Sequence, residues 1–178
     1  VPPWSDAELD AFLKQAPAIA DAIAKGGVRL RALATVPFNT RLLADLVTDG
    51  LDLTALYHLT TQAQLLDLYW RHRVAKNGTA AELCLQAAVS EMVETRALTA
   101  RRLVVAKADP VAFDKLLHEN VLILLRNDQH VAFRHHILFD YAASRLYLRP
   151  DDLNATAGLL KSDRGLGPRA IRGTHPTP

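Results

Sequence analysis

The sequence contains very little cysteine and no long hydrophobic run. Cys84 is the only cysteine among 178 residues, which excludes an internal disulfide framework and a cysteine-based zinc site. Hydrophobic residues make up 49% of the chain, but no stretch approaches the roughly 18 consecutive apolar residues of a membrane-spanning helix. The first residues, VPPWSDAELD, lack the basic start and apolar core of a secretory signal. We therefore expect a cytoplasmic protein with no membrane segment, in which Cys84 is a small buried residue.

The chain also lacks an excess of charge of one sign. It has 21 basic and 19 acidic residues, a net charge of +2. Residues 1–79, 80–149 and 150–178 carry 8, 9 and 4 basic residues against 8, 8 and 3 acidic ones. A protein that binds nucleic acid usually concentrates positive charge, because neutralising phosphates supplies most of the non-specific affinity. The even balance argues against DNA as a partner.

Sequence motifs of several enzyme classes are missing. The chain has no G-x-x-x-x-G-K-[ST] phosphate loop, no H-E-x-x-H and no G-x-S-x-G. The segment GLGPR at 165–169 is too short for a phosphate loop and is typical of a turn. His135 and His136 with Asp140 offer part of a metal site, but the sequence shows no second ligand cluster to complete it. We expect neither a metal site nor an enzyme in this chain by itself.

Residues 1–79 have the start and stop signals of a helical bundle. Ser5 followed by Glu8 forms a capping box that begins a helix. The pair Gly26-Gly27 ends a second helix, and a short third one follows at 28–34. These signals predict three helices before the one that Pro37 opens.

A proline opens the next helix. Pro37 stands at its first position and Gly50 follows its end. Thr60 or Thr61 then caps a longer helix, and the turn cluster KNGT at 76–79 separates the bundle from the rest of the chain.

Residues 80–149 combine helices with a hairpin. AAELCLQAAVSEMVETRAL predicts a long helix with Leu83 on its buried face, and residues 99–108 fit either a short helix or a partly extended segment. Asp109 caps a further helix, and residues 121–135 alternate around a polar turn as a β-hairpin does. A last helix runs from about residue 136 to 148. This order predicts a winged helix with one extra helix.

The sequence therefore predicts a mainly α fold in three parts. Residues 1–79 form a helical bundle, and residues 80–149 form a winged-helix domain with one β-hairpin. Residues 150–178 contain one more helix, at 153–160, whose apolar face has nothing of its own to cover it. Repeat units bury such faces by stacking on neighbours, so we interpret this part as the start of a helical repeat region that leads into a tail.

Two stretches resemble the STAND class of P-loop NTPases, in particular its NACHT-type members. LRALATVPFNTRLLADLV, residues 30–47, resembles the proline-opened helix of the family's lid. FRHHILFDYAASRLYL, residues 133–148, is similar to the family's run F-x-H-x-x-[FL]-x-[ED]-[YW]-x-A-[AR], which ends its winged helix. The resemblance covers about residues 5–149, and the matching positions of the second stretch are Phe133, His135, Leu138, Asp140, Tyr141 and Ala143.

The resemblance implies a regulatory fragment of a signalling ATPase. The family's phosphate loop and magnesium-binding strand precede the lid and are missing here, so ADP or ATP with Mg²⁺ would be bound only in the full-length protein. The expected partners are its own P-loop domain and C-terminal repeats, with a homo-oligomer formed on activation. The resemblance assigns His135 to the terminal phosphate of ADP and Pro37 to the base. An imidazole N–H donated to a phosphate is worth roughly 1.5–3 kcal/mol.

Other interpretations stay open. His135 is also explained as an ordinary residue at a strand-to-helix junction, and Pro37 as a helix-start proline. Tyr141 is expected in the core. The whole chain is alternatively a DNA-binding winged helix, although its recognition helix at 110–120 is net acidic, unlike helices that read the major groove. A third alternative is a helical adaptor that binds other proteins and no nucleotide.

Overall fold

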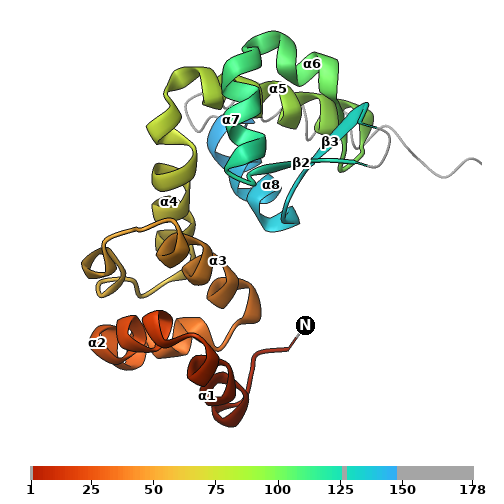
Figure 1. Cartoon of the computed structure of the whole chain (residues 1–178). Coiled ribbons are helices and arrows are strands. Elements are labelled where there is room, and N and C mark those ends of the chain that lie inside the picture. Colours follow the sequence, from red (N-terminus) through yellow and green to blue (C-terminus); the bar gives the residue numbers. More distant parts are fainter. Residues whose placement is uncertain (1, 126–127, 148–178) are drawn as a thin grey trace, which may run out of the picture.

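The computed structural model describes residues 2–125 and 128–147, which form two units connected by one helix (Figure 1). The first unit consists of α1 (Asp6–Gln15), α2 (Pro17–Ala34), α3 (Pro37–Thr48) and a 3₁₀ turn (Leu53–Leu56). Helix α4 (Gln62–Arg73) leads from it to the second unit, which contains α5 (Thr79–Thr95), β1 (Ala100–Arg101), α6 (Arg102–Ala108), α7 (Pro110–His118), β2 (Leu122–Leu124), β3 (His130–Phe133), α8 (His136–Ala142) and a π-helical turn (Ala143–Tyr147). The predicted mainly α fold with one hairpin is confirmed. The predicted repeat start at 150–178 lies outside the described residues.

The local signals in the first unit correspond to observed helix ends. The Ser5 hydroxyl accepts a hydrogen bond from the Glu8 amide, and the Glu8 carboxylate accepts one from the Ser5 amide at 2.8 Å. Helix α2 is kinked at Gly27, which has φ 72° and ψ −161°. The predicted break between the second and third helices is therefore a kink inside one helix.

Helix α3 is attached to the end of α2 by two buried polar side chains. Asn39 donates its amide to the Leu33 carbonyl at 2.9 Å, and the Thr40 hydroxyl donates to the Ala34 carbonyl. Both acceptors are last-turn carbonyls of α2, which lack partners within the helix. Pro37 opens α3 as predicted. The position of α3 beside the end of α2 is thus fixed by Asn39 and Thr40, the polar residues that follow Pro37.

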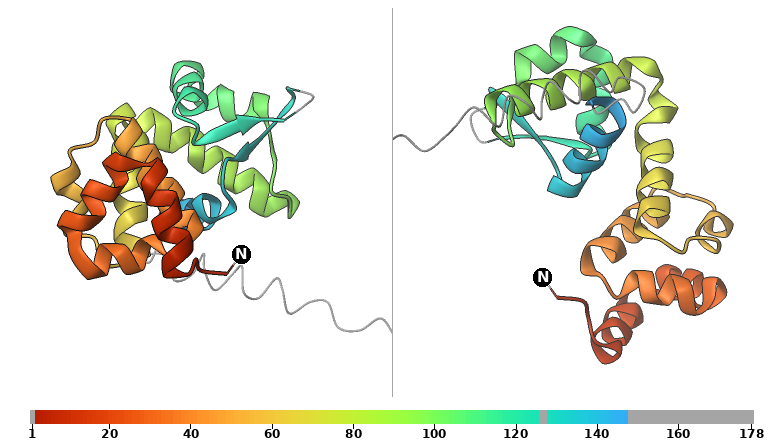
Figure 2. Two further views of the ribbon diagram at one scale, coloured as in Figure 1. Left: turned by 60° about the horizontal axis from the view of Figure 1, so that its bottom comes forward. Right: turned by 180° about the vertical axis from the view of Figure 1, so that it is seen from behind.

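The second unit has the topology of a winged helix (Figures 1 and 2). Its three strands form an antiparallel sheet in the order β1-β3-β2, with Ala100 opposite Val131 and Ile123 opposite Ala132. The segment that the sequence left ambiguous is both extended and helical, since β1 leads directly into α6. Glu91 of α5 fixes this strand by accepting the Arg101 amide at 3.0 Å.

The buried face of α5 differs from the expected one. Leu83 is 52% exposed, so its predicted burial is wrong, whereas Cys84 is buried as expected. The helix packs against α6, α7 and α8. These helices cover a different face of α5 from the one that was predicted to be buried. The buried residues of that face are Ala81, Cys84, Leu85, Ala88, Val89, Glu91 and Met92.

Replacing Gly27 tests the kink in α2. Its backbone lies in a region that is essentially restricted to glycine, and a Cβ there would meet nothing within 4 Å. Gly27→Ala should therefore lower the free energy of unfolding by about 1–3 kcal/mol through backbone strain alone. Urea denaturation would measure the change. The control is Val28→Ala at the exposed neighbouring position, and an equal loss in both variants would contradict the interpretation.

Candidate functional site between the two units

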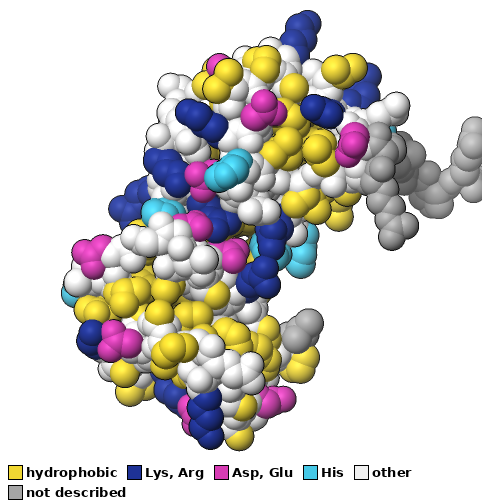
Figure 3. Space-filling model, in the orientation of Figure 1, with side chains coloured by type: hydrophobic (Ala, Val, Ile, Leu, Met, Phe, Trp, Pro, Cys, Tyr) yellow, Lys and Arg dark blue, Asp and Glu magenta, His cyan; other side chains and the backbone are white. Residues whose placement is uncertain are grey.

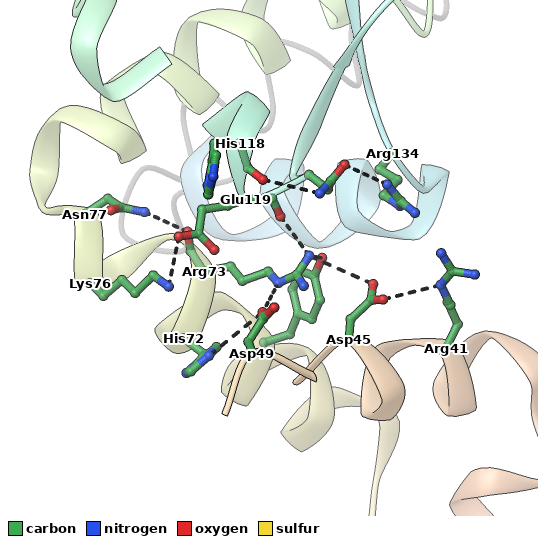
Figure 4. A network of polar contacts seen from close by, with 12 residues as sticks. Arg41, Asp45, Asp49, His72, Arg73, Lys76, Asn77, His118, Glu119 and Arg134 are labelled. Atoms are coloured by element: carbon green, nitrogen blue, oxygen red, sulfur yellow. Dashed lines mark hydrogen bonds and ion pairs between the residues drawn. The ribbon is translucent and has the colours of Figure 1, made fainter. Parts of the chain in front are cut away.

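Arg73, at the end of α4, joins the two units through a buried guanidinium group (Figure 4). Its side chain is only 6% exposed. The Nε atom donates to Asp49 at 2.7 Å, and Nη1 donates to the Tyr69 hydroxyl at 3.0 Å and the Glu119 carbonyl at 2.7 Å. Asp49 follows α3 and Glu119 follows α7. One side chain thus holds together the ends of helices from both units.

Polar contacts flank Arg73 on both sides (Figure 4). On one side Lys76 pairs with Glu119 at 3.0 Å. On the other side Arg41 pairs with Asp45 at 3.3 Å, and Arg134 donates to the Asn120 side-chain carbonyl at 2.8 Å. The junction is therefore predominantly polar, with cationic groups from both units near its edge.

A second set of contacts connects α4 to the C-terminal part of the winged helix. The Tyr141 hydroxyl donates to Asp67, and its ring lies edge-on to the Trp70 ring with centroids 5.6 Å apart. Arg145 bonds Asp67 at 3.3 Å and lies over the Trp70 ring. Tyr141 is partly buried and packs against the hydrophobic core from its edge, instead of lying inside it as predicted. It lies at the boundary, where its hydroxyl reaches a carboxylate.

His135 lies at the inner edge of the junction. It is the residue before α8, and its ring packs edge-on against Phe38 of α3, with centroids 5.3 Å apart. Its Nε2 atom is shielded from solvent and has no hydrogen-bond partner among residues 2–125 and 128–147. Burial and the neighbouring Arg134 lower the pKa of His135, and Asp45 opposes them. The neutral imidazole is therefore favoured.

Pro37 lines a hollow of about 510 Å³ in the first unit, together with Trp4, Phe12, Thr40, Arg41, Ala44, Asp45 and Thr48. The ring of Phe38, its neighbour in α3, contacts His135. The charges of Arg41 and Asp45 also act on the His135 imidazole. Figure 3 shows a concave side between the units, with Lys or Arg and His side chains gathered near its inner end. Residues next to Pro37 in α3 therefore lie beside His135, although the two stretches are far apart in the sequence.

The sequence interpretation missed the residue at the centre of this junction. Arg73 stands four residues after Tyr69 and eight after Leu65, both of which are buried. Residues at this spacing share one face of a helix. The pattern therefore contained a signal that Arg73 points inward, although it did not identify the partners of the guanidinium.

Comparisons with protein-family models, with curated proteins and with solved structures find no match to this chain. In the described part of the chain, no helix is long and apolar enough to cross a membrane. Among the same residues, no three His, Cys, Asp or Glu side chains are placed to hold a metal ion together.

Removing the Arg73 side chain tests its structural role. Arg73→Ala would leave the Asp49 carboxylate and the Glu119 carbonyl without their donor, and should lower the free energy of unfolding by about 2–4 kcal/mol. Urea denaturation would measure this. Arg41→Ala is the matched control, because the Arg41 side chain is 55% exposed. Its ion pair with Asp45 is expected to contribute less than about 1 kcal/mol. Equal losses would refute the central role of Arg73.

The junction should also respond to pH. His72, like His135, has a shielded Nε2 atom without a hydrogen-bond partner in the described ranges, although this atom lies 3.9 Å from an Asp49 carboxylate oxygen. Burial and Lys76 lower the pKa of His72, while Asp49 opposes them. The folded protein then binds fewer protons than the unfolded chain, whose histidines titrate near pH 6.5. The stability that these histidines contribute is present above about pH 6.5 and is lost as pH falls through their lowered pKa values.

Denaturation at several pH values would measure this dependence. We expect the free energy of unfolding to fall as the pH is lowered from about 7 towards 5. In the double variant His72→Gln/His135→Gln this fall should be much smaller. His136→Gln, at an exposed neighbouring position, is the control. A double variant with the same pH profile as the wild type would contradict the assignment.

Proposed function

We propose that this chain is the lid and winged-helix segment of a STAND-type ATPase, and that it couples the ADP or ATP state of a P-loop domain to signalling or oligomerisation. The observation that carries the proposal is the contact between Phe38 and His135. It joins the two stretches that resemble the family, which lie almost a hundred positions apart in the sequence. Pro37, the second expected nucleotide contact, is adjacent in α3.

The charges around His135 suit an anionic ligand. Arg41 comes from α3, and Arg134 precedes His135 in the winged helix (Figure 4). Arg41 shares its charge with Asp45, but Arg134 bonds only the neutral Asn120 side chain among the pairs within the described ranges. A phosphate near these groups would gain Coulomb energy from both units, and it would shift the pKa of the nearby imidazole upward.

The shielding of His135 Nε2 provides a mechanism for coupling. This nitrogen is shielded from solvent in the arrangement that the structure shows, in which the ring packs on Phe38. A phosphate therefore reaches it only when α8 moves relative to α3 or the ring rotates. The nucleotide that makes the better contact then favours one arrangement of the two units, which is a population shift driven by differential affinity. Helix α4, held to both units by Arg73, transmits the change.

The alternative DNA-binding function has less support. Lys115 is the one Arg, Lys, Asn or Gln among the exposed residues of α7, which are Pro110, Val111, Asp114, Lys115 and His118. Base edges and phosphates are normally contacted by Arg, Lys, Asn or Gln. The remaining alternative is an adaptor that binds other proteins. A surface that could serve this role, the groove between α6 and the hairpin, is described in the next subsection.

The proposal predicts the effect of His135→Ala in the full-length protein. Loss of the imidazole should weaken ADP retention roughly tenfold and raise basal activation, since one charge-assisted hydrogen bond is lost. Release of a fluorescent ADP analogue after a chase with unlabelled ADP would measure retention.

His136→Ala is the matched control, because this neighbour is exposed. Thermal melting of each variant separates loss of the contact from loss of the fold. ADP retention unchanged by His135→Ala would remove the sensor role. A parent gene that encodes no phosphate loop before Val1 would refute the ATPase assignment itself.

A further inference from the structure

A groove on the winged helix lies between α6 and the hairpin, at the far side of the unit from α4 (Figures 1 and 2). It has a volume of about 680 Å³. Arg101, Arg102 and Leu103 line one side, while Gln129 and His130 line the other. The two sides are joined by a hydrogen bond of 2.8 Å from the Arg102 amide to the Gln129 carbonyl.

The helix side of this groove carries its basic residues. Arg102 is exposed and forms no ion pair with any residue in 2–125 and 128–147. Arg101 is paired with Glu91 but remains largely exposed. Lys107 is exposed on the same helix, one turn beyond Leu103. Asp128 is the acidic residue among those that line the groove, and it stands on the opposite side. A ligand with carboxylates therefore fits the side formed by α6.

An exposed leucine stands among these charges. Leu103 is 83% exposed, and Val104 beside it lines the same groove. Water around an exposed leucine is released when an apolar group covers it, which favours binding. The wall that carries Leu103 is also held in place, because Glu91 of α5 accepts the Arg101 amide. A ligand therefore meets a surface that is already ordered, and little free energy is lost in ordering it.

We propose that this groove binds an acidic peptide segment of a partner protein, with one apolar side chain of the segment packed against Leu103. Carboxylates of the segment pair with Arg102 and Lys107. Nucleic acid fits less well, since the exposed Leu103 offers nothing to a phosphate backbone but can be covered by an apolar side chain of a peptide. This surface is independent of the nucleotide function proposed above, because it includes neither Pro37 nor His135.

Fluorescence anisotropy with defined probes tests the proposal on the 178-residue chain. The first probe is a labelled peptide of about 12 residues, rich in Asp and Glu with one central Leu. The second has Ser in place of that Leu, and the third has Lys in place of the acidic residues. A labelled DNA duplex of about 20 base pairs is the fourth. We expect the first peptide to bind most tightly, the Ser peptide at least about fivefold more weakly, and the Lys peptide and the duplex more weakly still.

Three substitutions of exposed residues locate the binding surface. Arg102→Glu and Leu103→Asp should each weaken binding of the first peptide at least about tenfold. Lys115→Glu makes the same change of charge on α7, outside the groove, and should change it less than about twofold. Circular dichroism checks that the variants fold.

Three results would overturn the proposal. The first is no preference for the acidic Leu peptide over its Ser and Lys counterparts. The second is a duplex that binds more tightly than any peptide. The third is an equal loss of affinity in Lys115→Glu, which would indicate general electrostatic attraction in place of a specific groove.

Discussion

The arrangement of the two units depends on the desolvated guanidinium of Arg73. Removing a charged group from water costs several kcal/mol, and a single partner seldom offsets that cost. Here the group contacts a carboxylate, a tyrosine hydroxyl and a backbone carbonyl, contributed by the end of α3, by α4 itself and by the end of α7. Because these acceptors belong to three segments, the hydrogen bonds are all formed together only at one angle between the units. The ion pair thus specifies geometry more than it adds stability.

The two sides of this junction differ in chemistry. Trp70 is 2% exposed, and its indole N–H donates to Glu82 of α5 at 3.1 Å, so this side combines apolar burial with a satisfied polar atom. The side near His135 instead has an unsatisfied ring nitrogen and two arginines. Unsatisfied buried polar atoms are uncommon in stable interiors. Under the proposed function, the Trp70 side would keep its contacts and the His135 side would be the one that rearranges.

The sequence predicted features that depend on neighbouring residues and missed those that depend on distant ones. The Ser5 capping box, the Pro37 start and the Asp109 cap act within one turn of helix and were recognised from spacing. The exposure of Leu83 depends on which side of α5 the later helices cover, and the strand before α6 depends on pairing with β3, a distant segment of the chain.

The same distinction holds for the candidate site. A resemblance to known stretches selected Pro37 and His135, and in the fold Phe38, the neighbour of Pro37, packs against the His135 ring. Asp49, Arg73 and Glu119 belong to no local motif and became visible only once α3, α4 and α7 met.

The order of the strands has a consequence for how copies of this chain behave in solution. In the described sheet β2 is an outer strand, so one row of its amides and carbonyls points away from β3. Such exposed edge strands pair with strands from other molecules and thereby start aggregation. With three residues, β2 offers too few hydrogen bonds to hold a foreign strand. Its shortness therefore protects the wing from becoming a template for fibrous growth.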